Sequence, residues 1–318
     1  EKVTRTSGPA RPEEEIRTSF VRNLGYFWIG RFAGALPYFG GAVAALLVFL
    51  LAGPRDREGS LAAAALAVSW VFYIVQIPDN WYGGGGTVGN RYFLNLLPLA
   101  FYLVPAARAL WVVVPAAALS AVFTLPILAA PMAHSLRPAL HALRAPFRAL
   151  PPELTMLNDL SVCTEPWRKR RPFGDTEGDP HKGWPADPKS YFLYFMDGGT
   201  YGKESREGVE GFWLRGAAPG EVVLRALEPV RRMTVRLSGG PAGDEVTVRV
   251  GGQSATLAVG PGEAREAAFT PPRGYRYYDT FLHVVRFRSR RAAPAPDGSG
   301  RELGAFVDIK LEPDPRPR

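Results

Sequence analysis

The side chains best suited to chemistry lie in one glycine-dense segment, residues 78–98. Four consecutive glycines, at positions 83–86, let the backbone approach a ligand closely or adopt positive φ angles. Arg91 follows them at the start of an apolar run, and its guanidinium offers a fixed fork of N–H donors that suits a phosphate group. These residue types at this spacing predict a site for a phosphate-bearing ligand beside a membrane.

Two nucleotide-binding motifs are excluded for this segment. Gly84, Gly86 and Gly89 satisfy a G-x-G-x-x-G spacing, but no apolar strand precedes them and no soluble helix follows. The phosphate-loop motif is excluded because no Gly-Lys-Ser or Gly-Lys-Thr is present. An ordinary interfacial hairpin stays open as the alternative, in which Arg91 reaches lipid head groups and the aromatic residues lie in the interface.

A resemblance to a known family lies in residues 81–98, which read WYGGGGTVGNRYFLNLLP. This string resembles the loop-to-helix segment, W-x-G-G … G-x-R-Y-x-x-x-x-x-P, of bacterial polytopic membrane glycosyltransferases of the GT-C type. The resemblance extends over about residues 20–130 and is strongest at residues 78–98. Enzymes of that family use lipid-phosphate-linked sugars.

The resemblance implies a role for each polar or aromatic residue of the segment. Arg91 would hold the phosphate of a polyprenyl-phosphate-linked sugar, and Asn80 and Asn90 would hydrogen-bond to sugar or phosphate oxygens. Trp81 or Tyr82 would stack on a sugar face. The partners so implied are membrane lipids, the lipid-linked sugar donor and a glycan acceptor.

The catalytic acid of the family has no counterpart in this chain. Family members carry that acid in a first external loop near the N-terminus, so we expect it upstream of residue 1. Asp79 is the only acidic residue of the glycine-dense segment and is a weak candidate, because an Asp beside an Asn-Trp turn more often forms a turn or a cap.

Apolar runs without charged residues surround this segment and must position it. A stretch of about 20 such residues crosses a hydrocarbon layer of about 30 Å. Helices buried in a large soluble protein usually run shorter and carry a polar stripe. We therefore expect an α-helical transmembrane bundle of about four spans within residues 32–131, at about 32–53, 61–77, 92–107 and 109–130.

The segments on either side of the bundle are expected to lie at the membrane surface. Residues 1–31 mix aromatics with arginines, as is typical of the head-group level. Residues 132–150 place leucines at helical spacing against arginines, which predicts an amphipathic interfacial helix. Residues 151–189 are rich in Pro, Gly and charge and are expected to be a linker.

From residue 190 the apolar period changes to two, which is typical of strands. The expected strands are bounded by turn signals and lie at 191–195, 221–225, 233–237, 245–250, 255–259, 281–288 and 305–311. Short strands at this spacing predict an all-β antiparallel sandwich, jelly-roll-like, over residues 190–313.

Three residues of the predicted sandwich are candidates for glycan binding. Tyr201 and Trp213 lie next to polar turns, and Asp197 opens one of those turns. Exposed aromatic rings beside a polar turn are how carbohydrate-binding modules present a stacking surface. The alternative is a hairpin turn with Phe212 and Trp213 partly in the core. His283 is expected to be an ordinary strand residue.

Composition limits the other classes of partner. The formal net charge is +8, but only residues 168–171 form a compact basic run, so nucleic-acid binding is not expected. Cys163 is the only cysteine, which excludes an intrachain disulfide and a cysteine-based zinc site. With four histidines and no clustered acids, no metal site and no cofactor are predicted, although a divalent metal stays open.

Orientation follows from the span count and the resemblance. Four spans put residues 1–31, the glycine-dense segment and the β domain on one side. The resemblance makes this the external side of a bacterial inner membrane, in a multi-pass protein. The count of positive charges opposes it, because arginines near span ends, such as Arg22 and Arg137, favour the cytoplasmic side.

Two functions are therefore open. The leading hypothesis is the C-terminal part of a membrane glycosyltransferase that transfers a hexosyl or pentosyl group from a lipid-linked donor, with an external sandwich for the acceptor glycan or for support. The alternative is a non-enzymatic, membrane-anchored protein whose sandwich binds glycan or another protein.

Overall fold

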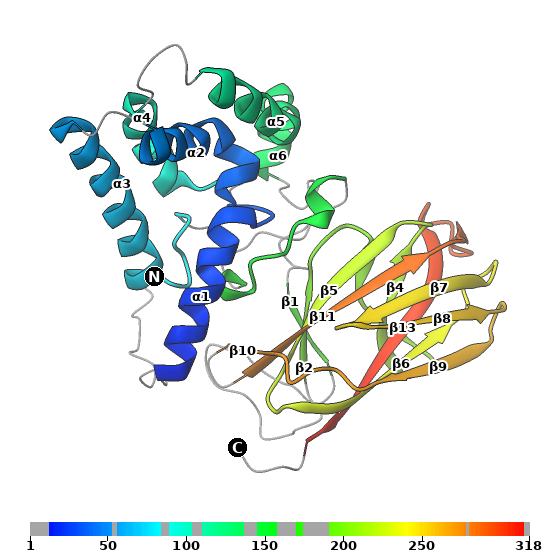
Figure 1. Ribbon diagram of the computed structural model, residues 1–318. Helices are drawn as coiled ribbons and strands as arrows, with labels where there is room; N and C mark the ends of the chain where they lie inside the picture. Colours follow the sequence, from blue (N-terminus) through cyan, green and yellow to red (C-terminus); the bar gives the residue numbers. More distant parts are fainter. Residues whose placement is uncertain are drawn as a thin grey trace, which may run out of the picture. The chain divides into compact units, whose positions relative to one another are not determined.

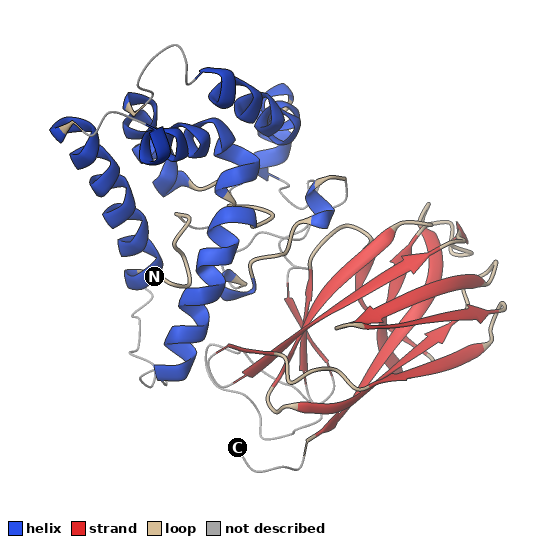
Figure 2. Ribbon diagram, viewed as in Figure 1, coloured by secondary structure: helices blue, strands red, loops and turns tan. Residues whose placement is uncertain are grey.

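The computed structural model describes residues 13–52, 56–83, 89–103, 110–136, 145–157, 170–173, 191–277 and 280–314. The chain divides into two compact units. One comprises residues 1–135 with 146–160 and is helical, and the other comprises residues 136–145 with 161–318 and is built of strands. Figure 1 shows the elements in chain order, and Figure 2 separates the helices from the strands.

The helical unit contains six α-helices and two short 3-10 helices within its described residues. The α-helices are α1 Glu13–Ile29, α2 Ala35–Ala52, α3 Arg57–Gln76, α4 Arg91–Tyr102, α5 Leu110–Ala129 and α6 Pro131–Leu136. The 3-10 helices are η2 Phe147–Ala149 and η3 Leu154–Met156.

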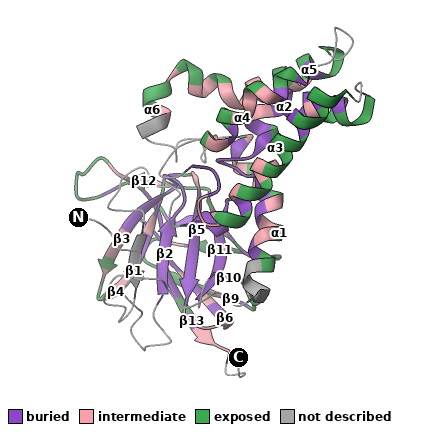
Figure 3. Cartoon of the chain, turned by 90° about the vertical axis from the view of Figure 1, so that its left-hand side faces the viewer, coloured by how far each residue is buried: buried purple, intermediate pink, exposed green. Residues whose placement is uncertain are grey.

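Three of these helices, α2, α3 and α5, are long and apolar enough to cross a membrane. Figure 3 shows many exposed residues on these helices. They include large apolar side chains, of which Trp111 on α5 is 83% exposed. Side chains of this kind are stable in contact with lipid and would be unfavourable in water.

The third expected span, 92–107, differs from the structure. The described helix there, α4, has 12 residues, which at 1.5 Å per residue gives about 18 Å, short of the hydrocarbon thickness. Pro98 lies inside it, and residues 104–109 are outside the described part of the chain.

Helices α2 and α5 pack closely through small residues. A Cβ on Gly40 would lie 2.9 Å from the Ala116 carbonyl oxygen and would also meet the Ser120 hydroxyl. The helix is kinked at Phe39, and the Ser120 hydroxyl bridges the break: it accepts from Gly40 N–H (2.8 Å) and donates to the Leu36 carbonyl (3.0 Å). Small residues at helix interfaces and hydroxyls that satisfy freed backbone groups are typical of membrane helices.

The second unit is a β-sandwich, and the strand pairings among its described residues are antiparallel. Its strands are β1 Arg170–Phe173, β2 Tyr191–Phe195, β3 Thr200–Arg206, β4 Val209–Arg215, β5 Pro219–Ala226, β6 Val230–Ser238, β7 Asp244–Val250, β8 Gln253–Val259, β9 Ala264–Phe269, β10 Tyr275–Tyr277, β11 Thr280–Ser289, β12 Ala293–Pro294 and β13 Glu302–Pro313. One sheet has the order β1-β2-β5-β11-β7-β8 with β10 beside β11. The other has the order β3-β4-β13-β6-β9 with β12 beside β13.

Alternate residues of the central strands face the space between the two sheets. On β6 these are Met233, Val235 and Leu237, and on the neighbouring β13 they include Val307 and Ile309. Since side chains alternate along a strand, the intervening residues point away from the core. The predicted fold class, membrane-type helices followed by a β-sandwich, is confirmed.

Two expected segment boundaries differ from the structure. In residues 132–150, positions 137–144 lie outside the described residues, and 147–149 form a 3-10 helix instead of part of an α-helix. Residues 152–157, expected within the linker, are buried in the helical unit. The prolines and Glu153 in this stretch favoured a solvent-exposed linker. In the structure, Leu154, Met156 and Leu157 are buried. Strand β1 also lies within the expected linker and pairs with β2.

Candidate functional site

Backbone hydrogen bonds fix the chain on either side of positions 84–88 in the glycine-dense segment. Arg91 N–H donates to the Tyr82 carbonyl (2.8 Å), and Gly89 N–H donates to the Phe32 carbonyl (2.6 Å). Gly83 and Gly89 have φ angles of +99° and +85°, which only glycine adopts readily. Positions 84–88 lie outside the described residues.

Three of the predicted ligand-binding residues in this segment are buried and have structural partners. Trp81 is 1% exposed, and its indole N–H donates to Asn23 Oδ1 (3.1 Å); Tyr82 is 0% exposed. Asn90 is 3% exposed and caps α4, since its Oδ1 accepts from Phe93 N–H (2.9 Å). The predicted stacking of Trp81 or Tyr82 on a sugar requires an open ring face, and both rings are enclosed.

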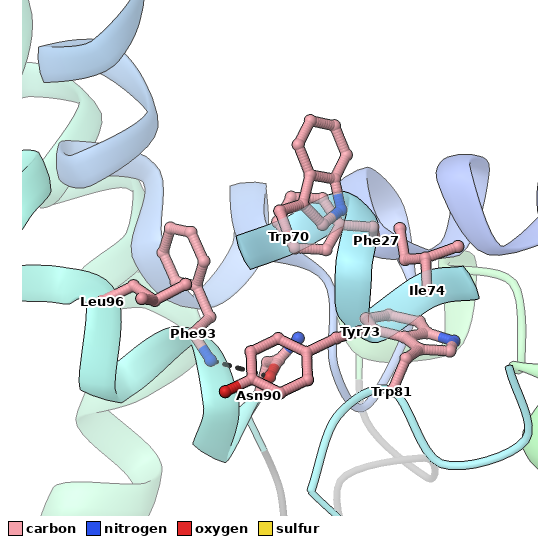
Figure 4. A pocket seen from close by; sticks show the side chains of 8 residues that line it. All are labelled: Phe27, Trp70, Tyr73, Ile74, Trp81, Asn90, Phe93 and Leu96. Atoms are coloured by element: carbon pink, nitrogen blue, oxygen red, sulfur yellow. Dashed lines mark hydrogen bonds between the residues drawn. The ribbon is translucent and has the colours of Figure 1, made fainter. Parts of the chain in front are cut away.

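The space beside these residues is too small for a sugar. It measures about 10 Å³, enough for one water molecule. Figure 4 shows its lining of mainly aromatic side chains, with the Asn90–Phe93 hydrogen bond at one side. Phe27 and Trp70 stack there with ring centroids 4.1 Å apart, so the cluster is an aromatic core.

Among the candidate residues of this segment, Arg91 has an exposed side chain. It is the first residue of α4 and packs along Gly83, where a Cβ would lie 2.9 Å from Arg91 Cβ. Asn80 is half-buried, and its Oδ1 is buried without a hydrogen-bond partner. Asp79 is also half-buried and has an interaction partner.

The structure adds a buried carboxyl group, Glu153, to the same region. Its Oε1 accepts from Phe32 N–H (2.8 Å) and Ala33 N–H (2.9 Å), while its Oε2 is buried without a partner. Burial raises its pKa from 4.5 to about 7, against the opposing effects of the two N–H groups and Arg31. Sequence reasoning missed this residue because it stands among prolines in an apparent linker.

Arg31 joins the same two segments of chain. It is 0% exposed, and its guanidinium donates to the carbonyls of Leu150 (3.0 Å) and Arg148 (3.3 Å). Together with Glu153 it fixes residues 148–153 against the junction of α1 and α2. The sequence had placed Arg31 at the membrane surface with other arginines.

The β-sandwich has an open pocket of about 420 Å³. Its wall comes from the end of β3, from β4, from the turns after β6 and β8, and from the loop that leads into β13. The lining residues that carry polar or aromatic groups are Arg206, Trp213, Asp297 and Arg301. The volume lies within the range of about 300–1,000 Å³ that small-ligand sites occupy.

Trp213 points away from the sandwich core, because its neighbours Phe212 and Leu214 point into it. Its ring meets Phe306 edge-on, with centroids 5.2 Å apart and planes at 68°. The guanidinium carbon of Arg206 lies 5.3 Å from the centroid of the indole, within cation–π range. Arg206 also donates one N–H to the Gly239 carbonyl (3.4 Å).

Arg301 and Asp297 are tied to each other and to their neighbours. Arg301 donates to Glu204 Oε1 (2.5 Å), Asp297 Oδ2 (3.3 Å) and Ser299 Oγ (3.2 Å). The hydrogen bonds from Ser299, and then the Arg301 charge, hold the pKa of Asp297 below its usual value. Asp297 is therefore an ionised acceptor at the pocket wall.

The two other predicted glycan-binding residues do not line this pocket. Tyr201 is 8% exposed, packs with Leu303, and its hydroxyl accepts from Glu302 N–H (3.1 Å). Asp197 is 2% exposed and closes a turn by accepting from Gly199 N–H (2.9 Å). Of the three candidates, Trp213 is the one that lines the pocket.

His283 lies on β11, and its role is structural. It is 5% exposed, and its Nε2 has no hydrogen-bond partner. Burial lowers its pKa from 6.5 to about 4, so it is neutral at pH 7. In the described part of the chain, His, Cys, Asp and Glu do not gather in groups of three that could hold a metal ion.

Comparison with known proteins leaves the family open. No protein-family model matches the chain, and no curated protein matches it. Among solved structures, the secreted serine protease VesC from Vibrio cholerae is 16% identical with a TM-score of 0.25, over 38% of this chain and 24% of that one. TmCBM61 in complex with beta-1,4-galactotriose is 12% identical with a TM-score of 0.24, over 39% and 88%.

A third solved structure is the CBM36-1 domain of a multidomain xylanase from the hindgut metagenome of Trinervitermes trinervoides. It is 10% identical with a TM-score of 0.23, over 40% of this chain and 99% of that one. Likenesses at these TM-scores carry no argument about function, which must come from the chain's own residues.

Proposed function

We propose that this chain is a membrane-anchored protein whose β-sandwich binds glycan in the pocket beside Trp213. The observation that carries the proposal is the pocket itself, with a volume of about 420 Å³ and a wall that includes one tryptophan, two arginines and one aspartate. The pocket near Trp81 and Asn90, at about 10 Å³, has no comparable capacity.

The chemistry of the wall suits a sugar. A sugar ring presents apolar C–H groups on its faces and hydroxyl groups around its edge. Trp213 supplies an apolar surface, and the ionised Asp297 accepts hydrogen bonds from hydroxyls. Pro241, Pro261 and Pro296 stiffen the turns that form the rest of the wall, which lowers the entropy cost of binding.

Anchoring is supported by the helical unit. Helices α2, α3 and α5 have the length and apolar composition of membrane spans. We place them in a bacterial inner membrane, with the sandwich on the external side, where glycans are accessible. This placement is part of the proposal and rests on the chemistry of the ligand.

The proposed binding is tested by calorimetric titration of oligosaccharides into the full chain in detergent. Trp213→Ala should weaken binding at least about tenfold, because truncating a buried aromatic anchor at a binding site costs on the order of 2 kcal/mol or more. Trp111→Ala on α5 is the matched control and should bind like the wild type. Equal affinities for all three proteins would sink the proposal.

A second candidate function is transfer of sugar from a lipid-phosphate-linked donor by the helical unit. The observation that favours it is the exposed Arg91 side chain at the N-terminal end of α4, where the helix dipole also attracts an anion. In this function Arg91 holds the phosphate and the sandwich binds the acceptor glycan.

Arginine substitutions at two helix starts test this second function. Arg57 is also exposed and is also the first residue of its helix, so Arg57→Ala is a matched control for Arg91→Ala. In the full-length protein, Arg91→Ala should abolish transfer from a polyprenyl-phosphate-linked sugar while Arg57→Ala retains it. If the two variants transfer sugar equally well, Arg91 is not part of the site.

A further inference from the structure

We infer that the pocket beside Trp213 selects an acidic sugar, one whose carboxylate pairs with Arg206. The inference rests on the proposed function, because it names the class of glycan that the same pocket takes. It follows from the ion pairs and hydrogen bonds that the charged residues of the pocket wall already form.

The charge of Arg301 is already balanced by neighbouring carboxylates. Arg301 is bound by two carboxylates, those of Glu204 and Asp297, and by the Ser299 hydroxyl. The charge of this guanidinium is balanced by the two carboxylates, and three of its five N–H donors are engaged. Asp297, in turn, gives one oxygen to Arg301 and the other to the Ser299 backbone N–H.

Arg206 differs from Arg301 in its partners. Within the described part of the chain its ion-pair partner is Glu207, whose Oε1 lies 3.5 Å from Arg206 Nε and whose side chain is 84% exposed. An exposed ion pair of this length contributes little, so a ligand carboxylate can replace Glu207. The hydrogen bond to the Gly239 carbonyl and the indole of Trp213 hold the guanidinium at the wall of the pocket.

The position of Arg206 over Trp213 also separates acidic from neutral sugars. A neutral ring that stacks on this face of the indole would displace the guanidinium from its cation–π contact. An acidic sugar keeps that contact and adds a charge-assisted, bidentate pair to it. The pocket therefore favours a glycan of the uronic-acid class.

The test compares two oligosaccharides of equal length, an oligogalacturonide and the corresponding galacto-oligosaccharide. Both are titrated into the full chain in detergent at about 50 mM and about 500 mM salt, concentrations that differ strongly in screening. The acidic ligand should bind at least about tenfold more tightly at the lower salt concentration, and high salt should reduce this preference.

Arg206→Gln removes the charge and should bring the two affinities within about threefold of each other, since only the charge-assisted pair is lost. The control is Arg249→Gln, an exposed arginine on the other sheet, which should keep the preference. Near-ultraviolet circular dichroism of both variants checks that the packing of the aromatic residues matches that of the wild type.

Each failure has a separate meaning. Equal binding of the two ligands to the wild type overturns the acidic-sugar inference and leaves glycan binding intact. A preference that survives Arg206→Gln, or that Arg249→Gln also removes, overturns the assignment to Arg206. Binding of neither these two ligands nor any other oligosaccharide overturns the proposed function itself.

Discussion

Glu153 is a carboxyl group whose surroundings favour its neutral form. Two backbone N–H groups bind one oxygen, but the other oxygen is buried without a partner, and burial raises the pKa to about 7. The same carboxyl connects with the glycine-dense segment, because the carbonyl of Phe32 accepts from Gly89 N–H. Its protonation state therefore affects the α1–α2 junction at Phe32 and Ala33.

The pH dependence of this site can be worked out from its pKa. The folded value, about 7, lies above the ordinary value of 4.5, so folding favours the protonated form. The stabilisation is complete below pH 4.5 and is lost as the pH rises through about 7. At about 1.4 kcal/mol per pH unit, the loss is on the order of 3 kcal/mol at most.

Thermal unfolding of the full chain in detergent at a series of pH values measures this loss. The wild type should become less stable between about pH 5 and pH 7.5, and Glu153→Gln should flatten that slope because glutamine cannot ionise. A variant with the same slope as the wild type would show that another group is responsible.

The individual residues of the pocket were the hardest feature to predict from the sequence. Trp213 was identified because an aromatic residue beside a turn has a recognisable chemistry. Arg206, Asp297 and Arg301 were not, since strands and loops about 90 positions apart bring them together. Trp81 or Tyr82 was predicted to stack on a sugar. Both side chains are buried instead, because their large apolar rings are more stable away from water.

At the scale of elements, the break in α2 depends on its contact with α5. The Ser120 hydroxyl completes the hydrogen bonding that the kink at Phe39 disrupts, and this requires the two backbones to lie close together. Gly40 makes the approach feasible, since a Cβ there would meet Ala116 and Ser120. The contact is thus set by the absence of a side chain.

Gly40→Val should destabilise the helical unit by about 1–3 kcal/mol, because overpacking a close helix contact forces the helices apart. Gly25→Ala on α1 is the control, since a Cβ there meets nothing within 4 Å and alanine favours the helix. Thermal unfolding in detergent compares both variants with the wild type. Equal stability of Gly40→Val and wild type would contradict the proposed packing.

The strands show which elements a sequence pattern can identify. The expected strands at 221–225, 233–237, 281–288 and 305–311 lie within β5, β6, β11 and β13. β3 and β4 were not predicted, because charged residues fill much of β3 and part of β4. β9 reads Ala-Arg-Glu-Ala-Ala-Phe, which has helical propensity, and pairing with β6 overrides it.

At the scale of the whole molecule, the two units should respond to pH in opposite directions. Ionisation of Glu153 makes the helical unit less stable as the pH rises. In the sandwich, burial lowers the pKa of His283 to about 4 from 6.5, so folding favours neutral histidine. That stabilisation is present above pH 6.5 and is lost as the pH falls through about 4.

His283→Asn tests the second half of this expectation. The wild-type sandwich should lose stability between about pH 6.5 and pH 4, and the variant should lose less, because its side chain takes up no proton. Hydrogen exchange of peptides from β11, measured in the full chain across this range, reports the change. An equal pH dependence in both proteins would exclude His283 as the cause.

The division into a membrane-type helical part and a β-sandwich was predictable from composition, because apolar runs of about 20 residues and a period of two are strong signals. The short length of α4 was not predictable, since a run of apolar residues does not reveal where its helix ends. The pocket beside Trp213 was not predictable either, because five separate segments of the chain form its wall.

The most direct test of the central claim is an experimental structure of the full chain with an oligosaccharide. Our account predicts ligand density in the pocket between Trp213 and Asp297, with Arg206 in contact with the sugar. Density for a specifically bound glycan elsewhere on the chain, with this pocket empty, would contradict it.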